Sequence, residues 1–242
     1  MSDYGFRVIN DYGSTTISSL NKVLVYSQRG SFSITSKYTD RPGYGAIVFS
    51  RPVLTAEPPQ LFFRWVSGSL SSITVYITMT GGAGYWTGCN VISGAGGSVL
   101  QDHNIEYVVC QTVSTRATSD FGLEVFDSNE SITYNSDARV VKYSQFTKHW
   151  EWVRGSVSDP IAIIRSNLVI APDEFVSVTS FNRGVNWFAQ GTRYVTLQLR
   201  SGGSPVVNIL WQYAPRDWYW GETGGTCFSI PICKFPISRY HD

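Results

Sequence analysis

Cysteine and histidine side chains are the residues of this chain that could support nucleophilic catalysis. Cys227 lies in the glycine-rich stretch 224–229 (GGTCFS), a setting that some cysteine hydrolases use for their nucleophile. The activating base would have to be His103 or His149, and both lie far from Cys227 in the sequence without a diagnostic motif around them. We therefore interpret Cys227 as a buried or edge cysteine, and we predict that the chain has no catalytic residue and is not an enzyme.

Glycoside hydrolysis is a second chemistry to weigh, because it needs two carboxylates on either side of a sugar bond. Glu151, between Trp150 and Trp152, is the most suggestive carboxylate. On a strand, Glu151 would point away from both rings, as expected of a solvent-facing charge between two buried tryptophans. No short motif selects a second carboxylate, so a glycan depolymerase is the third hypothesis for function.

The cysteines and histidines do not have the spacing of a metal site. No two cysteines form a C-x-x-C motif and the histidines lie far apart, so we predict neither a metal nor another cofactor. A disulfide between Cys227 and Cys233 is sterically conceivable. Four free, mostly buried thiols are the preferred interpretation, because reducing compartments disfavour disulfides. The residues concerned are Cys89, Cys110, Cys227, Cys233, His103, His149 and His241.

Two groups of aromatic side chains are candidate contacts for a partner protein or a glycan. Trp218, Tyr219 and Trp220 precede a glycine-containing stretch, and Tyr85 and Trp86 follow a glycine-rich turn. Such rings give a large contact area at low entropic cost. The interpretation that we prefer is that residues 218–220 cover the edge of a sandwich, and the alternatives are contact between subunits and contact with a sugar.

The chain contains an internal sequence repeat whose two copies align without a gap. The repeat indicates which structural elements position the candidate residues named above. Residues 4–27 (YGFRVINDYGSTTISSLNKVLVYS) and 121–144 (FGLEVFDSNESITYNSDARVVKYS) lie 117 positions apart and are identical at eight of 24 aligned positions. Ordinary residue usage would give roughly one to two matches. The repeat divides the chain into two similar modules, residues 1–116 and 117–242, with the join in a polar run at 114–120.

Each copy of the repeat begins with the pattern of a β-hairpin. Alternation at 6–9 or 123–126 predicts a strand, the polar run that follows predicts a turn, and Thr, Ser and Ile residues then predict the returning strand. Gly13 can take the positive φ of such a turn, and Asn129 is the expected left-handed residue in the second copy. A further apolar strand at 22–26 or 139–143 completes each unit.

Strand-like runs continue through the rest of the chain, and no stretch combines a sustained helical period with caps at both ends. We therefore expect an all-β protein made of two related β-sandwich-like modules, each opening with a β-hairpin unit. The clearest strand-like runs are 46–50, 60–66, 73–80, 105–109, 161–170, 174–180, 195–199 and 207–213.

Composition narrows the class of partner. Charged residues make up 15% of the chain and the net charge is +1, so the chain has far fewer charges than the roughly 25% of typical soluble proteins. No basic cluster interleaves with aromatic residues, so we expect no binding to nucleic acid. No apolar run reaches transmembrane length and the amino terminus lacks the features of a signal peptide, so we expect folding in a cytosol without membrane insertion.

The second copy resembles a hairpin that is common in structural proteins of tailed bacteriophages and prophages. In that hairpin a YGL-x-V-Phe/Tyr-Asn/Asp strand turns and returns as an aromatic residue followed by Asp/Asn-Ser. Residues 122–127 (GLEVFD) and 132–136 (ITYNS) carry the resemblance, and residues 3–10 (DYGFRVIN) are similar to the usual amino terminus of such proteins. The chain departs from the pattern at Glu130, where a turn glycine is usual, and at Ile17 and Ser18, where the aromatic–Asp pair is expected.

The resemblance covers about 24 residues twice and implies a virion component of the tail tip or tail fibre, folded and assembled in the cytoplasm of the bacterial host. The leading hypothesis is a structural protein that mediates assembly of the distal tail with other virion tail proteins. The resemblance also implies a closed homo-oligomer, such as a trimer about the tail axis. The second hypothesis is a module that binds a bacterial surface glycan as host receptor through Trp218, Tyr219, Trp220 and Trp86.

Overall fold

In the computed structural model, all the regular elements of the described residues are β-strands. Those residues are 7–9, 11, 15–39, 41–94, 98–147, 150–154, 161–166, 168–179, 193–200, 206–211 and 229–242. The prediction of an all-β protein is confirmed. Among these residues no helix is both long and apolar enough to cross a membrane.

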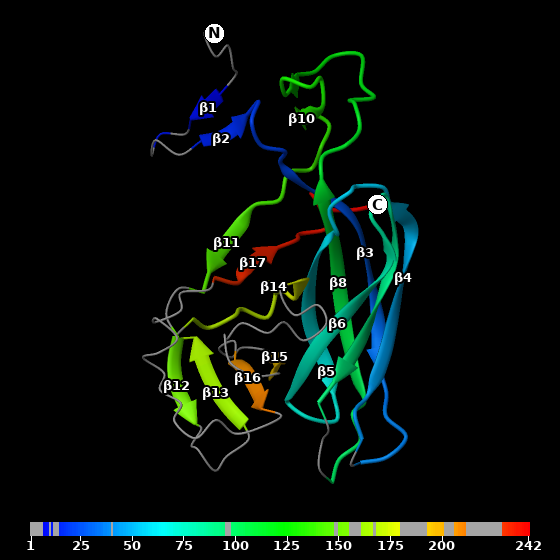
Figure 1. Cartoon of the computed structure of the whole chain (residues 1–242), viewed down its shortest axis with the longest axis vertical. Coiled ribbons are helices and arrows are strands. Elements are labelled where there is room, and N and C mark those ends of the chain that lie inside the picture. Colours follow the sequence, from blue (N-terminus) through cyan, green and yellow to red (C-terminus); the bar gives the residue numbers. More distant parts are fainter. Residues whose placement is uncertain are drawn as a thin grey trace.

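Two large antiparallel sheets and two small hairpins make up the fold (Figure 1). The six-stranded sheet has the order β11 (Tyr143–Phe146), β17 (Pro231–Lys234), β14 (Glu174–Ser177), β5 (Gln60–Gly68), β8 (His103–Thr112) and β3 (Leu24–Ile34). The seven-stranded sheet has the order β12 (Trp150–Arg154), β13 (Ile161–Ser166), β16 (Val206–Trp211), β15 (Arg193–Arg200), β6 (Ser72–Gly82), β7 (Tyr85–Ser93) and β4 (Tyr44–Val53). The hairpins pair β1 (Arg7–Ile9) with β2 (Thr15–Ser18), and β9 (Glu124–Phe126) with β10 (Ile132–Asn135).

The main hydrophobic core lies between the two large sheets. In β6, Ile73, Val75, Ile77 and Met79 are buried, while the residues between them are half-buried. This period of two places one face of the strand against the opposite sheet. Leu61 of β5 belongs to the same core from the six-stranded sheet.

A second core covers the opposite face of the six-stranded sheet. Phe62 follows Leu61 in β5 and therefore points to this other face. The ring of Phe235 packs edge-on against Phe62 at 5.3 Å, Phe175 at 5.5 Å and Tyr240 at 5.1 Å between centroids. This geometry is favourable for aromatic rings, so the C-terminal segment 235–242 is held across the sheet.

Both large sheets continue from the first half of the chain into the second. β5 pairs antiparallel with β14, with Phe63 opposite Val176, and β6 pairs antiparallel with β15, with Val75 opposite Leu197. We call these two pairings the seam. A boundary between residues 116 and 117 stays a prediction, and the two sides of that boundary share both sheets.

The strand order is the same on both sides of the seam when it is read outwards. In the six-stranded sheet it is β5-β8-β3 on one side and β14-β17-β11 on the other, and in the seven-stranded sheet it is β6-β7-β4 and β15-β16-β13, followed by β12. The register also repeats, because the cross-strand pair Tyr76–Ile92 recurs 118 positions later as Tyr194–Leu210. The internal repeat therefore extends in topology well beyond the hairpins.

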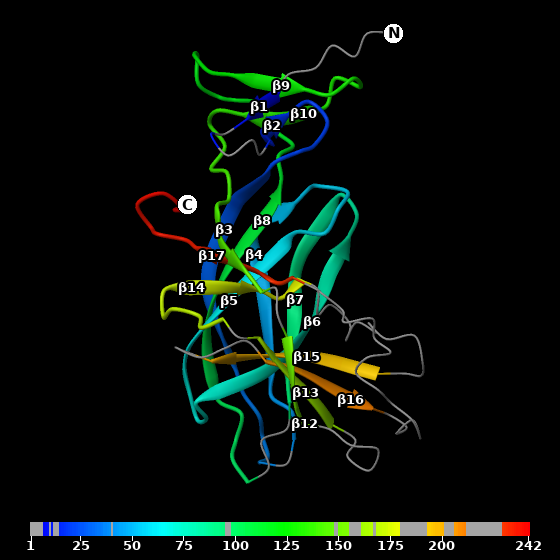
Figure 2. The same cartoon turned by 90° about the vertical axis from the view of Figure 1, so that its left-hand side faces the viewer.

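The two hairpins lie at the same end of the molecule, beyond the large sheets (Figures 1 and 2). Leu24 and Val141 are equivalent positions of the repeat, and the amide of Val141 donates to the carbonyl of Leu24 at 2.9 Å. The amide of Val23 donates to the carbonyl of Thr133 in β10 at 3.0 Å. The two copies thus meet each other at the bases of their hairpins.

The turn of the second hairpin corrects one prediction. Glu130, and not Asn129, takes the left-handed conformation, with φ of 60°. The carboxylate of Asp127 explains the choice, because it accepts the amides of Asn129 at 2.8 Å and Ser131 at 2.9 Å and so fixes the residues on either side of Glu130. Gly13, the turn residue predicted in the first copy, lies outside the described residues.

The strands expected from the sequence at β5, β6, β8 and β15 are present, but one prediction needs correction and one strand was missed. Residues 139–143 were expected to form a strand, whereas the structure has an isolated bridge between Val140 and Val25 there and a strand that begins at Tyr143. β7 was not predicted at all, because Thr, Gly, Cys and Asn interrupt its apolar residues.

The second core generates a prediction for stability. Phe62 is fully buried beside the seam, so Phe62→Ala should lower the free energy of unfolding by about 3–5 kcal/mol. The matched control is Val48→Ala on an exposed face of β4, which should change that free energy by less than about 0.5 kcal/mol. Denaturant unfolding measures both variants, and equal effects of the two would contradict the packing described.

Candidate functional site

The aromatic residues predicted from the sequence fall into two groups with different outcomes. Trp218, Tyr219 and Trp220 lie outside the described residues. Tyr85 and Trp86 begin β7 after a tight turn that needs glycine, since Gly81 and Gly84 have φ of +91° and +82°.

Trp86 has a structural role in this turn, and Tyr85 is the ring that faces solvent. The indole nitrogen of Trp86 donates to the carbonyl of Thr55 at 3.0 Å, and its ring packs against the main core. The side chain of Tyr85 is 59% exposed. Within this pair, therefore, Tyr85 alone presents a ring that a partner could contact.

The residues predicted for catalytic or metal chemistry are not assembled into a site in the described part of the chain. His103 is buried, its Nδ1 accepts the indole N–H of Trp65 at 3.2 Å, and burial lowers its pKa. Cys227 and His149 lie outside the described residues. Glu151 lies on β12, opposite Arg165 of β13. The described ranges contain no group of three His, Cys, Asp or Glu side chains able to hold a metal ion.

Three cysteines are free thiols, as the sequence favoured. Cys89, Cys110 and Cys233 are all buried, and burial raises the pKa of Cys89 and Cys233 to about 12. A thiol with such a pKa is almost wholly protonated at neutral pH and is a poor nucleophile. These cysteines act as small apolar residues of the core.

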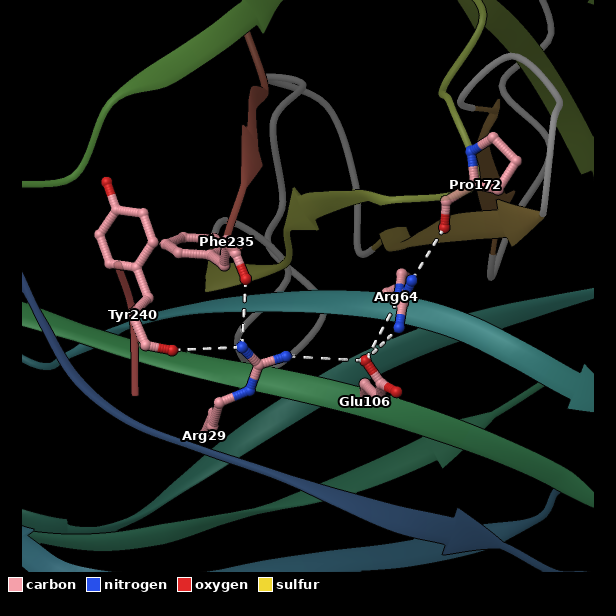
Figure 3. Close-up of polar contacts among 6 residues, drawn as sticks. All are labelled: Arg29, Arg64, Glu106, Pro172, Phe235 and Tyr240. Atoms are coloured by element: carbon pink, nitrogen blue, oxygen red, sulfur yellow. Dashed lines mark hydrogen bonds and ion pairs between the residues drawn. The ribbon is translucent and has the colours of Figure 1, made fainter. Parts of the chain in front are cut away.

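A polar network on the outer face of the six-stranded sheet was not predicted from the sequence (Figure 3). Two arginines share one oxygen of Glu106, with Arg64 donating from Nη2 at 2.5 Å and from Nε at 3.1 Å and with Arg29 at 4.0 Å. Arg29 also donates to the carbonyls of Phe235 at 3.1 Å and Tyr240 at 3.3 Å. We call this network the arginine clasp, because it fastens the C-terminal segment to the sheet.

The arginine clasp continues to the loop before β14. Arg64 donates from Nη1 to the carbonyl of Pro172 at 3.2 Å, and its guanidinium lies 5.2 Å from the centroid of the Phe175 ring. A hollow of about 310 Å³ beside the clasp is lined partly by Phe235 and Ile237. Because the guanidinium of Arg64 is already bound on several sides, this hollow has the character of a packing gap and not of a ligand site.

A larger hollow of about 500 Å³ opens between the second hairpin and the large sheets. We call it the hairpin hollow. It is lined from four parts of the chain: β3, the end of β4, the segment that follows β8 and the turn that follows β10, with the last two residues of the chain beside them. Three arginines line it, Arg51, Arg116 and Arg139.

The hairpin end of the molecule exposes large apolar side chains. Phe121 is 91% exposed and Leu20 is 85% exposed, and Ile9 and Leu123 are also exposed. These four residues belong to the two hairpins or lie next to them in the sequence. We call this set the apolar hairpin end. Large apolar side chains that are exposed on a surface can serve as contacts for another protein.

Comparison with models of protein families, with curated proteins and with solved structures finds no match to this chain.

The arginine clasp generates a second prediction for stability. Glu106→Gln removes the negative charge that two guanidiniums share, so it should lower the free energy of unfolding by about 1–2 kcal/mol. Asp120→Asn, at an exposed position in the segment before β9, is the matched control and should have almost no effect. Urea unfolding measures the free energy of unfolding of both variants. An unchanged free energy in Glu106→Gln would show that the clasp is only a surface contact.

The turn beside the hairpin hollow generates a prediction for pH. Asp137 accepts the amides of Thr118 at 2.7 Å and Ser119 at 2.9 Å and the hydroxyl of Ser119, and these bonds lower its pKa below the ordinary value of 3.8. Because folding lowers the pKa of Asp137, its contribution to the free energy of unfolding is complete above pH 3.8. That contribution is lost as the pH falls through the pKa of Asp137 in the folded state. The amide resonances of Thr118 and Ser119 should therefore shift with a midpoint below 3.8.

Asp137→Asn is the control in the same NMR titration, because its side chain does not titrate. The shift at residues 118 and 119 should disappear in this variant. A midpoint at or above 3.8 in the unmodified protein would contradict the bonds described.

Proposed function

We propose that the chain is a non-enzymatic structural component of a bacteriophage virion, located in the tail tip or tail fibre, where it mediates assembly of the distal tail. The support from the sequence is the resemblance of its hairpin copies to those of phage and prophage structural proteins. The support from the structure is that both copies do form separate hairpins, β1–β2 and β9–β10, which are not strands of either large sheet.

The apolar hairpin end is the observation that carries the proposal. An isolated pair of short strands is only marginally stable in water, so exposed apolar residues on such hairpins are best explained by a partner that covers them. Burying apolar surface contributes about 25 cal/mol per Å², which would stabilise the hairpins and the assembly together. The partners that we propose are other virion tail proteins and further copies of this chain in a homo-oligomer.

The lateral edge formed by β3 and β4 is less suited to such docking. Thr35 and Tyr44 exchange backbone hydrogen bonds across it at 3.1 and 2.8 Å, and the side chain of Gln28 accepts from the amide of Ser50 at 2.7 Å. These bonds satisfy edge groups that would otherwise pair with another strand. The assembly contacts are accordingly proposed at the hairpin end.

Binding of a bacterial surface glycan is the second candidate function, and one specific observation favours it. Tyr85 presents an exposed ring on the β6–β7 turn, and aromatic faces are common contacts for apolar ligand surfaces. Trp86 does not add to that surface, because its ring is packed against the core. This role is compatible with a place in the tail.

The test of assembly uses Phe121→Asp in the phage that encodes the chain, because a charge at the centre of an apolar contact is strongly unfavourable. We expect particles that lack the protein or lack a completed tail end, while the isolated variant remains folded. Tyr38→Asp, at an exposed position on the loop between β3 and β4, is the matched control and should assemble normally.

Electron microscopy of particles labelled with an antibody against the chain measures the outcome. Label at the distal end of the tail is the expected result, and its loss in the Phe121→Asp phage should accompany the assembly defect. Normal, labelled particles from the Phe121→Asp phage would rule out the hairpin end as the contact. Absence of label from every unmodified particle would rule out a virion component.

A further inference from the structure

Three arginines line the hairpin hollow, and none of them forms an ion pair with another described residue. Arg51, Arg116 and Arg139 come from three separate segments of the chain. Ion pairs in the described part of the chain join Arg29 and Arg64 to Glu106, and Lys234 to Asp173. The three arginines of the hollow thus have no carboxylate within 4.0 Å among the described residues.

Each of the three guanidiniums is nevertheless held in place by a contact within the chain. Arg51 donates to the carbonyl of Ser27. The guanidinium of Arg116 lies 5.2 Å from the centroid of the Phe126 ring, and that of Arg139 lies 5.9 Å from the centroid of the Tyr26 ring, with Nη2 of Arg139 also 3.3 Å from Nε2 of His241. Stacking on a ring leaves the in-plane N–H donors of a guanidinium available, and the contact with His241 occupies only one nitrogen of Arg139. The lining is therefore pre-positioned and still able to donate hydrogen bonds.

The two carboxylates at the hollow are already engaged elsewhere. Asp137 accepts bonds from Thr118 and Ser119. Asp242 accepts the phenol of Tyr26 at 3.0 Å. Both carboxylates keep their negative charge, but neither forms an ion pair within 4.0 Å with one of the three arginines.

We propose that the hairpin hollow binds an acidic, extended segment of a partner polypeptide, whose carboxylates pair with Arg51, Arg116 and Arg139. Guanidinium groups bind carboxylates with two parallel hydrogen bonds, which gives both energy and direction. A volume of about 500 Å³ is in the range of about 300–1,000 Å³ in which proteins enclose small ligands or a few side chains. The site shares no residue with the apolar hairpin end, and it does not depend on the chain being a virion protein.

The lining favours a polypeptide over an acidic saccharide. Tyr26 is the one Phe, Tyr or Trp residue of the lining, it is only 8% exposed, and Arg139 lies over its ring. A sugar would therefore find no open ring face on which to stack. Pro52 and Leu54 line the hollow beside Arg51, and Leu54 is 65% exposed. Aliphatic rims of this kind pack well against the side chains that neighbour an acidic residue in a peptide.

Fluorescence polarisation of the full chain with a fluorescein-labelled hexaglutamate peptide tests the proposal. We expect saturable binding that weakens as salt increases and no comparable binding of labelled hexaglutamine. The double variant Arg51→Gln/Arg139→Gln should bind at least about tenfold more weakly, which corresponds to about 1.4 kcal/mol. Lys37→Gln, an exposed cation on the loop after β3, is the matched control and should bind within about twofold of the unmodified protein.

A second pair of variants keeps the proposal testable if the double arginine variant does not fold. Leu54→Glu places a negative charge at the exposed rim and should weaken hexaglutamate binding at least about fivefold by repulsion, whereas Leu54→Gln should leave it unchanged. The proposed site would be overturned if the double variant Arg51→Gln/Arg139→Gln and the variant Leu54→Glu both bound hexaglutamate with the affinity of the unmodified protein. An oligogalacturonate that displaces the peptide at lower concentration than unlabelled hexaglutamate would overturn the polypeptide and identify an acidic saccharide.

Discussion

The seam between the two halves is the interaction on which the rest of the structure depends. Without the pairing of β5 with β14 and of β6 with β15, each half would present open strand edges next to half of an apolar core. Across the seam, the amide of Val178 donates to the carbonyl of Leu61 at 2.9 Å, and Leu61 itself lies in the main core. The same pairing therefore satisfies backbone groups and closes the core between the sheets.

The direct pairing of the two copies explains why both hairpins lie at one end. The backbone bond between Leu24 and Val141, which are equivalent positions, sets the segments that follow the two hairpins side by side. The hairpins precede these positions in the chain and therefore lie together at one end (Figures 1 and 2). The hairpin end exposes Leu20 beside the first hairpin and Phe121 beside the second, and these two residues are not equivalent positions of the repeat.

Local alternation was enough to predict most of the strands but not how they pair. β6 was evident because Ile73, Val75, Ile77 and Met79 alternate with polar residues, and burial of one face demands that pattern. The continuity of the sheets across the two halves depends on contacts between residues more than 100 positions apart, such as Phe63 with Val176. No local pattern encodes such a pairing.

The candidate sites were predictable to a smaller extent. Tyr85 was identified from its type and its turn, but the role of Trp86 depends on the carbonyl of Thr55, which no spacing indicates. Glu106 gave no signal because its partners, Arg29 and Arg64, lie on the two strands that flank β8. The arginines of the hairpin hollow are scattered for the same reason, and only the fold brings them to one opening.

Hydrogen–deuterium exchange of the full chain under native conditions tests the seam most directly. If the seam makes one cooperative unit, amides of β5 and β8 in the first half and of β14 and β17 in the second should exchange with the same free energy of opening, equal to that of global unfolding. Exchange of β14 and β17 through an opening that leaves β5 and β8 protected would contradict the account. That result would mean that the two halves are independent domains that merely touch.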